Sequence, residues 1–161
     1  MQKKIEGFRL SPQQRYVWRL LQDNQSYRAQ CVILLEGDLD VEALEQTIQK
    51  IVARHEILRT NFRRNPGISY PIQLIGEARV ILARDERQSE RNLTEEIEEL
   101  AAQQRSLPFD FEQGTLLHAS LVKLSEQTHL LLLCLPALCA DARTLRNLSN
   151  EIGRSYGAHI E

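Results

Sequence analysis

Three cysteines and four histidines are the side chains of this sequence that could bind a metal or act as nucleophiles and bases. The cysteines are Cys31, Cys134 and Cys139. Four residues separate Cys134 from Cys139, but no second pair of cysteine or histidine residues lies near them, and a structural zinc site needs four ligands. An odd number of thiols in apolar runs is typical of a protein that stays in a reducing compartment. We therefore predict no metal site and a cytoplasmic location.

The histidines are scattered singly along the chain, at His55, His118, His129 and His159. His55 follows a predicted helix, where the helix dipole stabilises a positive charge. His129 opens an apolar segment that we interpret as a strand. Cys139 would be a nucleophile only if a neighbour lowered its pKa, and its neighbours in the sequence are apolar. We therefore predict structural roles for His55 and His129, and a buried, unreactive thiol at Cys139.

The composition is that of one globular domain, which we assign to residues 1–161. Apolar residues make up 42% and charged residues 26%, the usual balance of a folded protein of this size. A net charge of −2 without a basic run argues against a nucleic-acid partner. The longest apolar run, 130–140, contains a proline and is far shorter than a membrane span. No apolar segment follows the first lysines, as a signal peptide would require. We predict neither membrane insertion nor secretion.

The spacing of apolar residues predicts helices that alternate with strands. Ser11 and Gln14 match a capping box at the start of the first helix, and Asp40 is a typical N-cap for the second. The predicted helices are 12–23, 41–52, 95–104 and 142–156, the last ended by Gly157, and the predicted strands are 29–35, 57–63, 71–75, 80–83, 116–124 and 129–135. Residues 130–133 are apolar on both faces, which places their strand in the middle of a sheet. The fold class that follows is an α/β (α+β) sandwich, with a mixed or antiparallel sheet and helices packed on it.

Four segments resemble, in the same order, the core motifs of condensation domains of nonribosomal peptide synthetases. Residues 10–18 (LSPQQRYVW) are similar to the first motif, 54–62 (RHEILRTNF) to the second almost letter for letter, 108–117 to a strand entry, and 129–141 occupy the place of the third. The resemblance covers nearly the whole chain but only the first of the family's two lobes. It implies a single lobe of the chloramphenicol acetyltransferase-like fold, from a family whose activity is amide-forming acyl transfer between carrier-bound substrates.

The third motif departs from the family at the residues that carry the chemistry. The family places His-His-x-x-x-Asp-Gly there, and this chain has Pro136 and Ala137 at the two histidine positions, followed by Asp141 and Ala142. The second histidine is the family's presumed catalytic group, and an alanine side chain can neither donate nor accept a proton. The resemblance therefore implies that this chain holds no catalytic residue.

The aspartate is the member of the third motif that remains. In the family it is mainly structural and pairs with the arginine that corresponds to Arg59. The resemblance therefore implies a buried or half-buried ion pair between Arg59 and Asp141. The sequence by itself also allows Asp141 to be the N-cap of the last helix.

These features favour a catalytically inactive condensation-like half-domain, which acts as a structural or protein-interaction module beside an adenylation or carrier module. A related interpretation is a platform that recruits a tailoring enzyme to a carrier-bound peptide. The alternative is half of a split acyltransferase that becomes active when a second lobe docks. The chain itself is expected to hold no cofactor, because phosphopantetheine would arrive on a partner carrier protein.

The loop 135–140 is almost wholly apolar, whereas the family is polar and rich in histidine at this place. We expect this region either to be packed shut or to lie in a protein–protein contact, a homodimer included. An open polar cleft lined by His55 or His129 would instead favour the enzyme.

Overall fold

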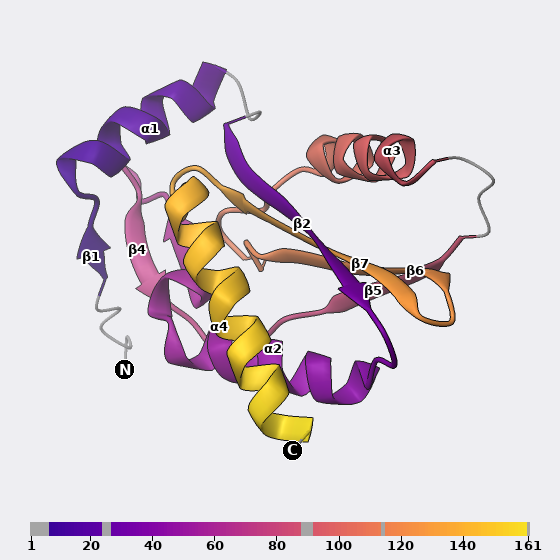
Figure 1. Ribbon diagram of the computed structural model, residues 1–161. Coiled ribbons are helices and arrows are strands. Elements are labelled where there is room, and N and C mark those ends of the chain that lie inside the picture. The colour runs from indigo at the N-terminus through magenta and orange to yellow at the C-terminus, as the bar shows by residue number, and fades with distance from the viewer. Residues whose placement is uncertain (1–6, 24–26, 88–91, 114, 161) are drawn as a thin grey trace.

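The computed structural model describes residues 7–23, 27–87, 92–113 and 115–160, and these form two β-sheets and four α-helices (Figure 1). The helices are α1 (Pro12–Asp23), α2 (Val41–Arg54), α3 (Leu93–Ser106) and α4 (Ala142–Ile160), with a short 3-10 helix, η1 (Glu56–Arg59). The strands are β1 (Phe8–Arg9), β2 (Arg28–Glu36), β3 (Thr60–Arg63), β4 (Ile72–Ile75), β5 (Leu82–Glu86), β6 (His118–Ser125) and β7 (Thr128–Pro136).

The larger sheet has the strand order β2-β7-β6-β5. Its pairs are antiparallel except β5 with β6, which is parallel, so the predicted mixed sheet is confirmed. The apolar strand β7 lies between β2 and β6, and all its residues from 129 to 136 are buried, as the pattern of residues 130–133 predicts. A smaller antiparallel sheet has the order β1-β4-β3.

The helices cover both faces of the larger sheet (Figure 1). Helix α3 packs on β2 and β7, over a cluster that contains Leu100, Leu130 and Leu132. Helix α4 packs on β2 and on α2 at the opposite face, where the main core lies. That core continues to α1 and the smaller sheet through an aromatic group. In this group Phe111 stands edge-on to Trp18 at 5.6 Å and to the fully buried Phe62 at 6.3 Å. None of the described helices is both long and apolar enough to cross a lipid bilayer.

The predicted helix starts are confirmed by their hydrogen bonds. The Gln14 N–H donates to Ser11 Oγ at 3.2 Å and the Ser11 N–H donates to Gln14 Oε1 at 3.0 Å, which is the capping box. Asp40 Oδ1 accepts from the Ala43 N–H at 2.9 Å. These contacts satisfy N–H groups that have no partner inside a helix.

Several element boundaries differ from the prediction: β5, for example, is Leu82–Glu86 where 80–83 was predicted. Two further differences coincide with identifiable contacts. Residues predicted as one strand, 57–63, begin instead with η1, because the Thr60 hydroxyl donates to the Glu56 carbonyl at 2.7 Å and closes a tight turn. Helix α4 runs past Gly157 to Ile160 instead of ending there. The hydroxyl of Tyr156 accepts from the Asp40 N–H at 2.9 Å, a contact that ties the last turns of α4 to the start of α2.

Candidate functional site: the third-motif loop

The loop that corresponds to the third motif follows β7 directly and is a tight turn. The N–H groups of Cys139 and Ala140 donate to the Pro136 carbonyl at 2.9 and 3.3 Å, and the Ala137 N–H donates to the Tyr27 carbonyl at 2.9 Å. Leu138 is 4% exposed, and Cys139 and Ala140 are also buried. The side chains of Leu138, Cys139 and Ala140 therefore pack into the chain's own core, whereas Ala137 is half-buried.

A groove of ≈ 390 Å³ remains above this loop. Its walls come from the loop, from the N-terminal parts of α1 and α4, and from η1. The lining residues are Ser11, Gln13, Gln14, Val17, Ile57, 137–141 and Thr144. The Gln14 side-chain amide donates to Gln73 Oε1 at 3.0 Å and to the Leu138 carbonyl at 3.5 Å, which fixes α1 over the loop. Asp141 is the one carboxylate in this lining, and no histidine is part of it.

Asp141 is the N-cap of α4, the second role that the sequence allows. Its Oδ1 accepts from the Thr144 N–H at 2.7 Å and from the Thr144 hydroxyl at 2.8 Å. The backbone and then the side-chain hydrogen bond of Thr144 lower the pKa of Asp141 below its ordinary value. The carboxylate is exposed and stays charged, so its pKa makes it a poor base near neutral pH.

The predicted ion pair between Arg59 and Asp141 is wrong in this structure, where each side chain has other partners. Arg59 Nη1 donates to the Gly76 carbonyl at 2.8 Å, and Arg59 Nη2 lies 3.9 Å from Glu56 Oε1. The physical reason is position: Arg59 is on η1, next to the backbone of the smaller sheet, while Asp141 points to solvent at the start of α4.

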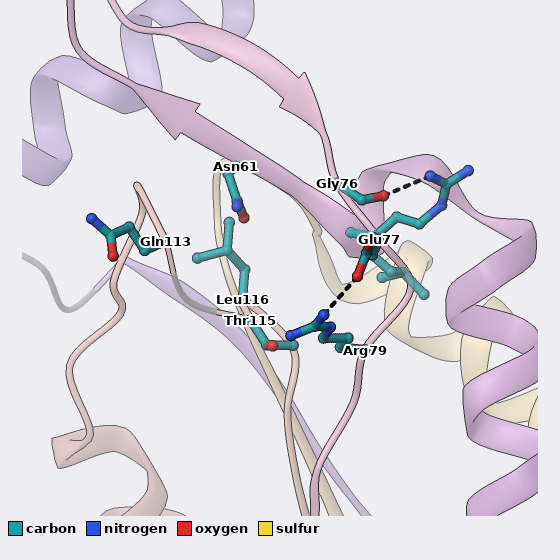
Figure 2. Close-up of a pocket in the computed structure, with 9 residues that line it drawn as sticks. Asn61, Gly76, Glu77, Arg79, Gln113, Thr115 and Leu116 are labelled. Atoms are coloured by element: carbon teal, nitrogen blue, oxygen red, sulfur yellow. Dashed lines mark hydrogen bonds and ion pairs between the residues drawn. The ribbon is translucent and has the colours of Figure 1, made fainter.

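Arg59 instead lines a separate polar cavity of ≈ 210 Å³ (Figure 2). The side chains of Asn61, Gln113 and Thr115 line it. Arg79, which also lines it, forms a salt bridge to Glu77, with 2.7 Å between Arg79 Nη2 and Glu77 Oε2. This cavity shares no lining residue with the groove above the third-motif loop. The structure therefore does not bring the Arg59 cavity and Asp141 together as one site.

His55 is the C-cap of α2, at the helix end where it was predicted. Its Nε2 lies 2.7 Å from Glu151 Oε2, and the other Glu151 oxygen accepts from Arg54 Nη1 at 2.6 Å. Burial by itself raises the pKa of Glu151, but the hydrogen bonds from His55 and Arg54 outweigh it and hold the pKa below its usual range. Glu151 was not singled out in the sequence, because its pairing with His55 spans 96 residues.

A cavity of ≈ 230 Å³ lies beside His55 and Glu151. It shares Ile57 and Thr144 with the groove above the third-motif loop, so the two hollows adjoin. His55 thus lines a cavity beside the groove, and its ring is already engaged with the Glu151 carboxylate.

His129 and Cys139 have the surroundings that their sequence neighbours predict. His129 is 6% exposed at the start of β7, the end of the strand opposite to the loop. Burial first, and then the charge of Lys123, lowers the pKa of His129. Burial raises the pKa of the Cys139 thiol to about 12, which keeps it protonated and unreactive at neutral pH. Among the described residues, no group of histidine, cysteine or carboxylate side chains could hold a metal ion.

Two solved structures share this arrangement of elements. The chain is 26% identical to the X-domain from teicoplanin biosynthesis, with a TM-score of 0.82, over 98% of this chain and 34% of that one. It has the fold of the starter condensation domain of the rhizomide synthetase RzmA, with a TM-score of 0.83 at 15% identity, over 95% of this chain and 38% of that one. The fold is therefore that of one lobe of a chloramphenicol acetyltransferase-like domain, as the motifs imply.

The sequence profile described as Condensation domain matches residues 5–160, and the chain belongs to this family. It is 32% identical to surfactin synthase subunit 2 of Bacillus subtilis (strain 168), over 97% of this chain and 4% of that protein. It is 34% identical to chondramide synthase cmdD of Chondromyces crocatus, over 92% of this chain and 4% of that protein. The chain thus spans a small part of these synthetases and about a third of the solved domains.

The capping role of Asp141 predicts a pH-dependent loss of stability. Asp141→Ala should lower the melting temperature at pH 7, because the first turn of α4 loses its acceptor, whereas Asp141→Asn keeps an acceptor oxygen and should lose less. The pKa of Asp141 is lowered by folding, so its contribution is present above the ordinary value of 3.8 and is lost as the pH falls through the lower folded value. Calorimetry at pH 7 and at low pH measures both effects. An Ala variant that melts with the native chain at pH 7 would contradict the capping role.

Proposed function

We propose that this chain is a catalytically inactive condensation-like lobe, which serves as a protein-interaction module within a nonribosomal peptide synthetase. The observation that carries the proposal is the pair Pro136 and Ala137 at the positions where the family places its histidines. The groove above this loop offers a proton acceptor only in Asp141, whose oxygen is engaged as a helix cap. General-base catalysis usually contributes about 10²–10⁴-fold to a rate, and this groove lacks the group that would supply it.

The closed packing of the loop supports an architectural role. Leu138 and its neighbours belong to the main core, so the loop stabilises the lobe where a catalytic loop would face its substrate. The partners that suit such a module are an adenylation domain, other synthetase domains, or a carrier protein that delivers its own phosphopantetheine. One solved relative, at 25% identity, is a complex of the X-domain and OxyB from teicoplanin biosynthesis, which supports a role in binding a second protein. Three free thiols suit a cytoplasmic location for the assembly.

A second candidate is half of a split acyltransferase, favoured by the cavity that adjoins the groove. His55 and Glu151 line this cavity and form a hydrogen-bonded pair, which is an arrangement that can orient a base. Their mutual contact and the salt bridge from Arg54 also tie α2 to α4, and this structural role accounts for the pair without catalysis.

Amide-forming assays with carrier-bound donor and acceptor substrates separate the two candidates. We expect no product above background from this chain, either alone or with a separately produced second lobe of a condensation domain. Product that depends on the added lobe and is lost in His55→Ala would contradict the proposal and establish the split enzyme. Glu42→Ala, a change on the same helix but outside the cavity lining, is the control for nonspecific effects on α2.

A further inference from the structure

Strand β2 has the sequence of a central strand but lies at the edge of the larger sheet. Residues 31–35 read Cys-Val-Ile-Leu-Leu, and charged side chains stand only at its two ends, Arg28 and Glu36. In the described part of the chain β2 pairs with β7 alone (Figure 1). None of its nine residues is buried, and Leu34 is 41% exposed, whereas the neighbouring β7 is buried from 129 to 136. A long apolar strand with one open edge is a template for pairing with another strand.

The other sheet edges in the described residues carry the usual protection, and β2 does not. The β3 edge is covered, because the Phe62 N–H donates to the Phe111 carbonyl at 2.7 Å. The β5 edge carries three consecutive charged residues, 84–86, and β1 is two residues long. Short or charged edges resist further pairing, whereas β2 has neither a proline nor an interior charge.

The hydrogen-bond pattern shows which groups of β2 face outward. Beyond the ends of the strand the Ala137 N–H donates to the Tyr27 carbonyl, and the Gly37 N–H donates to the Gln127 carbonyl, both at 2.9 Å. In an antiparallel pair, alternate residues direct both backbone groups to the partner strand. The odd-numbered residues of β2 therefore bond to β7, and the even-numbered residues, Gln30, Val32 and Leu34 among them, direct N–H and C=O away from it.

We propose that β2 pairs antiparallel with β2 of a second copy of this chain, about a two-fold axis at Val32. This register places outward-facing residues opposite each other: Val32 opposite Val32 of the partner subunit, and Gln30 opposite Leu34 of the partner subunit. At both ends of the pairing it also sets Arg28 opposite Glu36 of the partner subunit, so opposite charges lie near each other twice. Arg28 keeps its own hydrogen bond, in which Nη1 donates to the Leu107 carbonyl at 3.0 Å. The four strands of each copy then form one continuous eight-stranded sheet.

The pairing closes at two copies. A two-fold contact uses the same edge on both copies, and each described chain offers a single long, unprotected edge. The expected product is a discrete dimer rather than a fibre. The interface does not involve the third-motif loop, so this inference is independent of whether the lobe is catalytic.

Sedimentation equilibrium from low micromolar to several hundred micromolar chain tests the proposal. We expect a reversible dimer of the 18.6 kDa chain. Val32→Pro should abolish it, because the lost N–H faces outward and is not used in the pairing with β7, while Val32→Thr keeps the N–H and should still dimerise. Glu36→Arg should raise the dissociation constant roughly tenfold, because both cross-strand charge pairs become repulsive. Circular dichroism establishes that each variant is folded.

Three results would overturn the proposal. They are a native chain that remains monomeric at the highest concentration, larger assemblies in place of a dimer, and a folded Val32→Pro variant with an unchanged dissociation constant. If Val32→Pro does not fold, Leu34→Lys decides instead. It places a charge at an exposed position of the edge, and an undiminished dimer in that variant would equally contradict the pairing.

Discussion

Phe62→Ala should lower the free energy of unfolding by about 3–5 kcal/mol, the usual loss when a buried phenylalanine is truncated. Phe62 is fully buried on β3, and its ring stands edge-on to Phe111, which in turn contacts Trp18 and Phe109. Removing the ring leaves a cavity where the smaller sheet, α1 and the segment around Phe111 meet. Small domains have a total stability of only about 5–15 kcal/mol, so a large part of it would be lost. Urea unfolding followed by circular dichroism measures the change.

Phe8→Ala is the matched control for this prediction. It is the same substitution on β1 of the same sheet, but the Phe8 side chain is 60% exposed. Surface substitutions of this kind usually change stability by less than about 0.5 kcal/mol. Equal losses in the two variants would show that the aromatic group around Phe62 does not hold the lobe together.

Much of this fold is predictable from local sequence, because caps and strand patterns act over a few residues. Ser11 with Gln14, and Asp40, mark their helix starts through side chains that bond within three residues. The apolar run of β7 predicts its central place in the sheet, since both faces of such a strand must be covered. Element types therefore follow from patterns that the chain carries locally.

Contacts between distant segments are what the sequence left open or misassigned. Arg59 bonds to the Gly76 carbonyl rather than to Asp141, and nothing near Arg59 in the sequence marks a backbone carbonyl as its partner. Helix α4 continues past Gly157, and the Tyr156 hydroxyl in its last turns accepts a hydrogen bond from a residue 116 positions away. The edge position of β2 is equally hidden, because its apolar sequence resembles that of a central strand.

The second large effect that we predict is on the rate of amide formation, and it depends on the third-motif loop. A hybrid domain, in which this lobe is joined to the second lobe of a condensation domain from surfactin synthase subunit 2, tests the loop in the presence of a second lobe. Two forms of the hybrid differ only in the loop: one keeps it, and the other carries Pro136→His, Ala137→His and Ala142→Gly. If the absent histidine is what removes activity, the second form should be faster by about 10²–10⁴-fold, the usual contribution of a general base.

The rate of amide formation by the hybrid with the unaltered loop is the most direct test of catalytic inactivity. The intact condensation domain of the relative, with the same carrier-bound substrates, sets the scale. The proposal predicts that the unaltered hybrid, although folded, forms no product above the uncatalysed background. Product at a rate comparable to that of the intact relative would contradict it, because Ala137 would then stand in a loop that catalyses amide formation without the family's histidine.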